Sequence, residues 1–310
     1  MSLSMPQGIA LDFEDLIQVP PLSQLLPNTL VASQRYGLLR AASRGRGMEF
    51  SEARAYQPGD DIRTIDWRIT ARTGKPFTKL FREERDRNVY IILDLDPAMY
   101  FGSKGQLKAR FASLIAASCT WQAHDMKDKV GGMIVVGDTP VRQQPSSIRK
   151  DILAWLHKIY QGYQQGLLRQ DFKFSVNDAL RIYVNKARPG SVFHIISDFY
   201  RFDDTAWLYL RRLNKGHSVR TYQIYDQLEK EIVGNGTIGI NTGTNQCYVS
   251  SFDTSFVENY DRIGSKRIRN IDRLLSESSQ RNICIDVSQT LCCETRERHQ
   301  DNPASSTQAR

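Results

Sequence analysis

Residues 89–103 read VYIILDLDPAMYFGS, and this stretch decides the fold class. Its first five residues, Val89 to Leu93, are a continuous apolar run, which is typical of a strand buried on both faces of a parallel sheet. The acidic residues Asp94 and Asp96 follow this run immediately. Because parallel α/β sheets bind ligands at the carboxyl ends of their strands, these two carboxylates are the first candidates for a functional site.

Strand-length and helix-length segments alternate after this strand, which predicts an α/β fold with a doubly wound, mostly parallel sheet. A turn at Gly137-Asp138 is expected to join two of the strands. The predicted helices cover 104–126, 147–160, 175–187, 204–214 and 256–279. The other predicted strands cover 130–136, 141–144, 192–196, 218–225 and 282–287.

The chain divides into five predicted segments. Residues 1–34 are a loose, proline-containing leader that ends in the start of a helix over 28–42, and residues 35–87 hold two turn signals and form a small β element. Residues 88–226 are the α/β domain. Residues 227–290 form an extension that begins with a glycine- and asparagine-rich, hairpin-like stretch and completes the domain. Residues 291–310 lack apolar periodicity and are predicted to be disordered.

The composition is that of a globular protein: 310 residues, 40% hydrophobic, 25% charged and 10% aromatic. The apolar stretch over 111–124 is shorter than the roughly 20 residues of a transmembrane helix, so no membrane span is predicted. The amino-terminal residues carry Asp12 and Glu14 where a secretory signal has basic residues, which indicates a cytoplasmic protein. Five cysteines without a CxxC pair indicate reduced thiols and no thiolate metal site.

The net charge of +8 allows attraction to nucleic acid, anionic lipid or an acidic partner. Over residues 35–87 basic and acidic residues are interleaved, which favours ion pairs over a phosphate-binding face. Without a basic helix or an aromatic stacking platform, nucleic-acid binding rests on the charge alone.

A third carboxylate, Asp198, follows the predicted strand over 192–196. We expect Asp94, Asp96 and Asp198 to meet in one crevice, where their mutual repulsion calls for a cation or for hydrogen-bond donors. A hard divalent ion with oxygen ligands is the natural occupant. The alternative is that Asp94 and Asp198 cap the turns or helices that follow them.

A long motif, RAYQPGDDIRTIDWR over residues 54–68, precedes the sheet. Together with ARTGKPFTKLFREERD over 71–86 and the SDFYRFDD and YDQLEKE segments, it resembles the bacterial domain-of-unknown-function-58 family, whose core is similar to a von Willebrand factor type A domain. The resemblance covers roughly residues 35–287. The motif residues of interest are Arg54, Tyr56, Gly59, Asp60, Asp61, Arg63, Asp66, Trp67 and Arg68.

The resemblance implies a metal-ion-dependent adhesion site, in which hydroxyls and carboxylates hold a divalent cation and an acidic side chain of a partner completes its shell. Asp94 matches the first ligand, Asp96 and Ala98 stand where the family pattern has two serines, and Asp198 matches the acidic residue of the third loop. Ser175 is the hydroxyl available for the threonine position. A degenerate site is therefore expected, with magnesium, calcium or manganese bound weakly or not at all.

The resemblance also implies a function. The family is similar to genomic companions of MoxR-type AAA+ ATPases, so we expect a non-enzymatic adaptor that binds such an ATPase in an assembly or maturation system.

The motif itself has two physical interpretations. Pro58-Gly59 sets a turn that Asp60 and Asp61 can hold through their own backbone. Asp66, between Arg63 and Arg68 and beside Trp67, can form ion pairs over an aromatic face and lock the small β element onto the main sheet. The alternative is a partner-binding surface.

An enzymatic alternative remains. Asp94 and Asp96 after an apolar strand also fit a haloacid-dehalogenase-like phosphatase, with Asp94 as nucleophile, Asp96 as acid/base, a magnesium ion and a lysine. Pro97 and Ala98 depart from the residues which that pattern prefers. Among the histidines, His194 lies within a predicted buried strand and is expected to be a hydrogen-bonded core residue.

Overall fold

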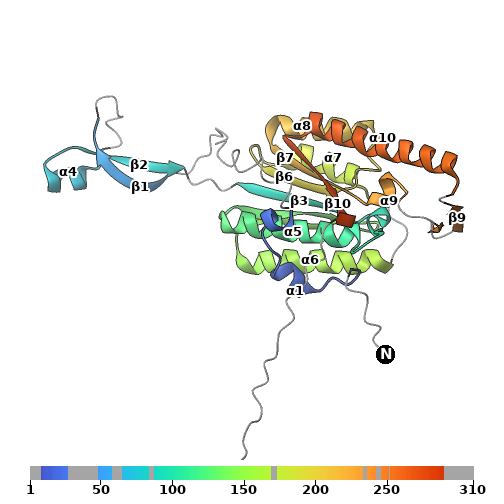
Figure 1. Cartoon of the computed structure of the whole chain (residues 1–310). Coiled ribbons are helices and arrows are strands. Elements are labelled where there is room, and N and C mark those ends of the chain that lie inside the picture. Colours follow the sequence, from blue (N-terminus) through green and yellow to red (C-terminus); the bar gives the residue numbers. More distant parts are fainter. Residues whose placement is uncertain are drawn as a thin grey trace, which may run out of the picture.

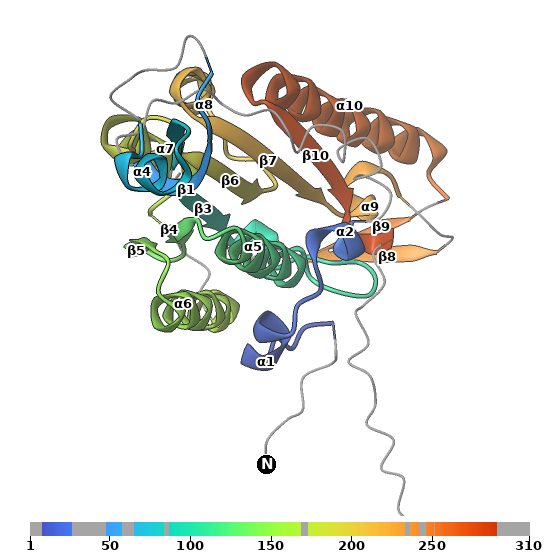
Figure 2. The same cartoon turned by 90° about the vertical axis from the view of Figure 1, so that its left-hand side faces the viewer.

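The computed structural model describes residues 8–26, 48–57, 65–83, 87–168, 173–232, 236–241, 246–250 and 252–289. Its centre is a six-stranded sheet with the order β10-β7-β6-β3-β4-β5 (Figures 1 and 2). The strands are β3 Asn88–Asp94, β4 Lys129–Val135, β5 Val141–Ser146, β6 Val192–Ser197, β7 Ser218–Tyr225 and β10 Arg281–Asp286. All neighbouring pairs are parallel except β4 and β5. The predicted doubly wound, mostly parallel sheet is confirmed.

The strand order has a topological switch point. From β3 the chain first proceeds outward through β4 and β5, and then returns to place β6 on the other side of β3. At such a point the loops leaving the two neighbouring strands diverge to opposite faces of the sheet, which opens a crevice at the carboxyl edge. In this chain the crevice lies beyond Asp94 of β3 and Ser197 of β6.

Helices cover both faces of the sheet (Figure 2). One face carries α5 Lys108–Asp125 and α6 Arg149–Leu168, and the other carries α7 Val176–Lys186, α8 Asp204–Gly216 and α10 Thr254–Ser278. Short helices fill the connections: η3 Pro97–Met99 after β3, α9 Gln227–Lys230 after β7 and η4 Val287–Gln289 after β10.

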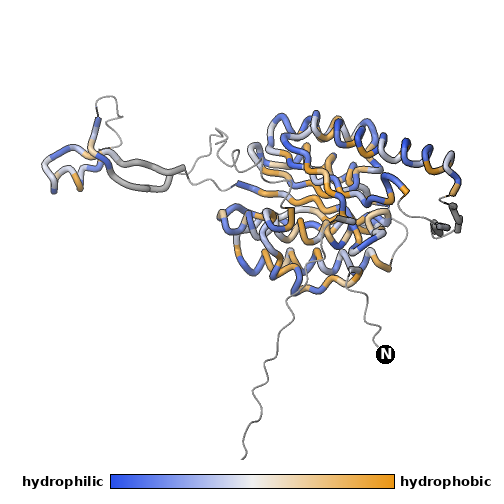
Figure 3. The backbone as a smooth tube through the Cα atoms, viewed as in Figure 1, coloured by the Kyte–Doolittle hydropathy of each residue, from blue (hydrophilic) through white to orange (hydrophobic). Residues whose placement is uncertain are grey.

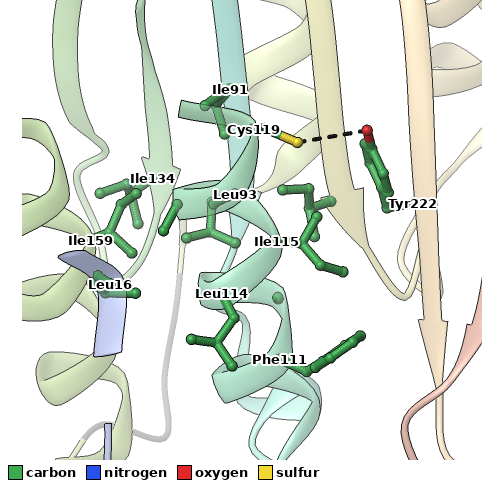
Figure 4. Packing of buried hydrophobic residues seen from close by; sticks show 14 of the residues in the cluster. Leu16, Ile91, Leu93, Phe111, Leu114, Ile115, Cys119, Ile134, Ile159 and Tyr222 are labelled. Carbon is green, nitrogen blue, oxygen red and sulfur yellow. Dashed lines mark hydrogen bonds between the residues drawn. The ribbon is translucent and has the colours of Figure 1, made fainter. Parts of the chain in front are cut away.

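The alternation of side chains along β3 divides the core into two layers. Ile91 and Leu93 pack into the cluster formed with α5 and α6 (Figure 4), whereas Tyr90 and Ile92 pack against α7 and α8. All four side chains are at most 7% exposed, so the uninterrupted apolar run of this strand reflects burial on both faces. Figure 3 shows the same pattern, with hydrophobic central strands and a hydrophilic outer side of α10.

The amino-terminal segment is packed onto the body, contrary to the loose leader that was predicted. Residues 8–26 contain α1 Phe13–Ile17 and α2 Leu22–Leu25, and Leu16 is fully buried in the core cluster with α5 and α6. The Trp121 indole Nε1 donates to the Leu16 carbonyl at 3.0 Å. The leucines of this segment are buried against α5 and α6, and no local pattern in the sequence predicts this packing. The helix predicted over 28–42 lies outside the described residues.

The small β element is a separate two-stranded sheet. Strand β1 Met48–Ala55 pairs antiparallel with β2 Phe77–Glu83, and α4 Trp67–Thr73 lies between them in the chain. This ribbon lies beyond the edge of the main sheet in Figure 1 and pairs with none of its strands.

The expected locking of this element onto the main sheet through Asp66, Arg63 and Arg68 stays a prediction, because Arg63 lies outside the described residues. Asp66 is the N-cap of α4, and its Oδ1 accepts hydrogen bonds from the backbone of Arg68 and Ile69. Trp67 is 68% exposed. Arg54 donates to the carbonyl of Ala55 at 3.3 Å. Gly59, Asp60, Asp61 and Arg63 lie outside the described residues.

The carboxyl-terminal extension begins with α9 and continues with a second small sheet. Strand β8 Thr237–Asn241 pairs antiparallel with β9 Gln246–Ser250, as the hairpin-like sequence predicts. The predicted disordered tail, 291–310, lies outside the described residues. In the described ranges, no helix has the length and apolar character needed to cross a membrane.

Candidate functional site

Asp94 lies at the end of β3, inside the switch-point crevice, and its side chain is nearly buried. Its Oδ1 accepts a hydrogen bond from the backbone N–H of Asp96 at 3.1 Å, and its Oδ2 accepts one from the Ser197 hydroxyl at 2.6 Å. Burial, and then the charges of Asp198 and Asp96, raise the pKa of Asp94 to about 8. The carboxyl group is thus mostly protonated at neutral pH.

Asp96 begins the turn after β3 and binds an arginine from another loop. Its Oδ1 accepts from the backbone N–H of Ala98 at 3.1 Å, which caps η3, and its Oδ2 accepts from the guanidinium of Arg201 at 2.5 Å. Arg201 comes from the loop between β6 and α8, and 58% of its side chain is exposed. This ion pair therefore joins the loops that leave β3 and β6.

Asp198 turns toward a buried lysine. The ammonium group of Lys108, the first residue of α5, lies 3.1 Å from Asp198 Oδ2 and 2.8 Å from Glu229 Oε1. The Lys108 side chain is 0% exposed. Burial alone would lower the pKa of Lys108, but the charges of Asp198 and Glu229 outweigh burial and hold this pKa above its usual value.

The partners of Lys108 are themselves fixed by local structure. Glu229 belongs to the capping box of α9, where its Oε2 accepts from the backbone N–H of Asp226 at 2.9 Å. Asp226 is fully buried and accepts from the backbone N–H of Ser103 at 2.9 Å. The loops after β3, β6 and β7 are thereby connected around one buried ammonium group.

Ser175 comes from the start of α7, on the opposite side of the crevice. Its hydroxyl donates to Asp178 Oδ2 at 2.9 Å and it is the N-cap of the helix. Ser175 lines a small cavity of about 10 Å³, which is the scale of one water molecule. The lining residues are Asp94, Asp96, Ser175, Val176, Asn177, Ser197, Arg201 and Phe202.

The structure therefore brings together three of the four predicted ligand positions. Asp94, Asp96 and Ser175 face one cavity, whereas the Asp198 carboxylate bonds to Lys108 instead. The capping alternative also holds: Asp94 accepts from the backbone of Asp96, and Asp198 Oδ1 accepts from the backbone of Tyr200 at 3.0 Å. Hydrogen-bond donors and the cations Lys108 and Arg201 thus offset the mutual repulsion of the three aspartates at this edge.

The contacts at this edge come from protein hydrogen-bond donors. Each of the four carboxylate oxygens of Asp94 and Asp96 accepts one hydrogen bond, which leaves one acceptor site on each oxygen. Within the part of the chain that the structure describes, no group of three or more histidine, cysteine or acidic residues is placed to hold a metal ion. Magnesium, which keeps several of its waters, would find little room in the cavity. Metal binding at this edge stays a prediction of the resemblance.

Sequence reasoning missed Lys108, Arg201 and Glu229. Lys108 pairs with residues 90 and 121 positions away in the chain, and no local pattern signals such distances. Arg201 had a weak signal, because it follows Asp198 within the same strand-end loop.

The exposed face of α10 carries a cationic stripe that was also missed. Arg262, Lys266, Arg269 and Arg273 recur at helical spacing and are exposed, and they line an open depression of about 670 Å³. Arg267, on the same helix, places its guanidinium 4.8 Å from the ring centroid of Tyr200, in the loop of Arg201. The 4-3-4 spacing of the basic residues was the signal in the sequence.

Comparison with known proteins identifies the family. The model of the family described as "Protein of unknown function DUF58" matches residues 52–267, which is more than half of the chain. The chain belongs to this family, as the motif over residues 54–68 indicated.

Individual relatives and solved structures are more distant. An uncharacterized protein of Mycobacterium tuberculosis (strain ATCC 25618 / H37Rv) is 29% identical over 196 residues, which cover 63% of this chain and 60% of the relative. The conserved hypothetical protein BatB from Bacteroides thetaiotaomicron is 13% identical, with a TM-score of 0.38, over 64% of this chain and 90% of its own. The VWA domain of SpRpn10 is 12% identical, with a TM-score of 0.36, over 67% of this chain and 92% of its own.

Proposed function

We propose that the protein is a non-enzymatic interaction module that docks a protein partner at the carboxyl edge of its sheet. The observation that carries this proposal is the concentration of polar and charged groups from three loops at the topological switch point. Burying a lysine and several carboxylates is costly, and structural stability alone gives little reason to retain them. The adaptor role and the cytoplasmic location expected from the sequence belong to this proposal.

The shape of the site favours a macromolecule over a small substrate. Small-molecule sites usually enclose about 300–1,000 Å³. The cavity between Asp94, Asp96 and Ser175 has about 10 Å³. Tyr200, beside it, is 58% exposed and offers an aromatic contact of the kind that is enriched at protein interfaces.

The phosphatase alternative finds little support at this edge. A nucleophilic aspartate has to be ionised and accessible to its substrate, whereas Asp94 is buried and burial raises its pKa to about 8. The nearby Lys108 is buried against Asp198 and Glu229. We expect no magnesium-dependent turnover of p-nitrophenyl phosphate.

The partner we propose is a MoxR-type AAA+ ATPase. Binding of such an ATPase, purified from the same organism, is measured by biolayer interferometry with the wild type, Tyr200→Ala and Met126→Ala. Met126 is a matched control, because it is 59% exposed and lies just before β4, at the amino edge of the sheet. Tyr200→Ala is expected to weaken binding about tenfold, and Met126→Ala to leave it unchanged. No binding by the wild type, or equal loss in both variants, contradicts the proposal.

A further inference from the structure

The acidic groups at the carboxyl edge are balanced by two cations of the protein itself. Lys108 lies against Asp198 and Glu229, and Arg201 lies against Asp96. In the adhesion site that the resemblance implied, a divalent ion would provide this positive charge. Here a guanidinium group bonds directly to the carboxylate that follows Asp94 by two residues.

The Arg201 guanidinium has capacity for a second partner. An arginine carries five N–H donors in a planar array that matches a carboxylate. Among the described residues, the hydrogen-bond acceptor of Arg201 is Asp96 Oδ2, which its Nη1 contacts. With 58% of the side chain exposed, the other donors are open to an anionic group from outside.

The neighbouring surface continues the positive charge. Tyr200 precedes Arg201, and its ring forms a cation–π contact with the Arg267 guanidinium. This contact connects the loop to α10. From there the exposed stripe of Arg262, Lys266, Arg269 and Arg273 follows the helix. At 1.5 Å per residue, the stripe is about 16 Å long, enough for several acidic side chains of one segment.

We propose that Arg201, Tyr200 and the cationic stripe of α10 form one docking surface for an acidic segment of a protein partner. In it, Arg201 takes the place of a divalent cation and binds a carboxylate of the partner directly. A single carboxylate matches the planar donors of one guanidinium group, so an acidic side chain of the partner can pair with Arg201 alone. Ile263, 57% exposed within the same depression, adds an apolar contact that suits a peptide. The inference rests on the proposed docking function and names its chemistry.

A fluorescein-labelled hexaglutamate peptide tests this surface by fluorescence anisotropy. The wild type is expected to bind it equally well in excess EDTA and in excess magnesium chloride. Arg201→Gln should weaken binding about tenfold, because a charge-assisted hydrogen bond is lost. Lys266→Gln combined with Arg269→Gln should weaken it roughly fivefold.

Arg87→Gln is the matched control. Arg87 is also a partly exposed arginine in one ion pair, with Asp128, but it lies at the amino edge of the sheet. This variant should bind the peptide as the wild type does. Thermal melts establish that each variant is folded.

Three outcomes overturn the inference: binding that disappears in EDTA, equal affinity of wild type and Arg201→Gln, or tighter binding of a fluorescein-labelled oligothymidylate than of the peptide. The ATPase experiment separates this inference from the proposed function. If Tyr200→Ala weakens ATPase binding while the peptide shows any of these outcomes, the docking function holds and the inference fails. If the ATPase does not bind but the peptide behaves as expected, the proposed ATPase docking function fails and the acidic-segment surface holds.

Discussion

The two edges of the central sheet hold their charges differently. At the amino edge, Arg87 forms a bidentate ion pair with Asp128, with distances of 3.1 and 2.8 Å, between the starts of β3 and β4. At the carboxyl edge, the loops after β3, β6 and β7 bring several carboxylates around Lys108 and Arg201. One ion pair is enough to anchor a loop. More charged groups meet at the other edge than a single loop anchor uses, which is why we propose the docking site there.

The largest effect is expected from Lys108→Met at the carboxyl edge. The change leaves Asp198 and Glu229 without their buried counter-charge, and breaking such a buried pair costs about 3–5 kcal/mol in the free energy of unfolding. Urea denaturation measures it. Adding Glu229→Gln should recover part of the loss, because one uncompensated carboxylate is removed. A stability within about 1 kcal/mol of the wild type would mean that the ion pairs of Lys108 contribute no more than an exposed surface pair.

A pH effect is expected from His194, which lies in β6 between the two edges. His194 is buried, with Nδ1 3.0 Å from the Tyr222 hydroxyl, as expected for a core residue. Burial, and then the charge of Arg220, lower its pKa to about 3. In the unfolded chain His194 therefore becomes protonated below pH ~6.5, whereas in the folded chain it stays neutral down to pH ~3.

Above pH ~6.5 His194 is neutral in both states and contributes no pH dependence, whereas between pH ~6.5 and ~3 it lowers the free energy of unfolding by about 1.4 kcal/mol per pH unit. Urea denaturation at a series of pH values measures this slope. His194→Gln should make the slope shallower by the equivalent of one proton. Identical slopes in the two proteins would show that His194 is protonated in the folded state.

The variants Arg87→Gln and Arg201→Gln test the two edges against each other. Removing Arg87 leaves Asp128, whose side chain is 5% exposed, without its ion pair and should cost about 1–3 kcal/mol. Removing Arg201 should cost less than about 1 kcal/mol, because its side chain is largely exposed and screened by solvent. Stability should thus depend on Arg87 and partner binding on Arg201. Thermal denaturation measures the first, and the reverse order would contradict the assignment.

The sequence predicted the sheet better than the site. The apolar run before Asp94 and the alternation after it were sufficient for the strands, because burial on both faces leaves a local pattern. The strand-end argument placed Asp94 and Asp96 at one edge, whereas Ser175, which lines the same cavity, was indicated only by the family resemblance. Lys108 could not be found in this way, since a lysine at a helix start is usually solvated and its partners are distant in the chain. The prediction of a loose leader was wrong because the burial of its leucines depends on α5 and α6, which are distant in the chain.

The smallest effect is expected outside the main sheet, at the N-cap of α4. Asp66→Ala removes the side-chain acceptor for the backbone of Arg68 and Ile69, at a cost of about 1 kcal/mol to this helix. Because β1 and β2 form their own sheet, amide exchange should rise in α4 while the core strands remain protected. Faster exchange in β3 or β6 would instead indicate coupling to the body.

The most direct test of the central claim is hydrogen–deuterium exchange of the protein with and without the proposed partner, a MoxR-type ATPase. The account predicts new protection in the loops after β3 and β6 and along the exposed face of α10, around Tyr200, Arg201 and Arg269. Protection confined to the amino edge, around Arg87, Met126 and Asp128, would contradict it.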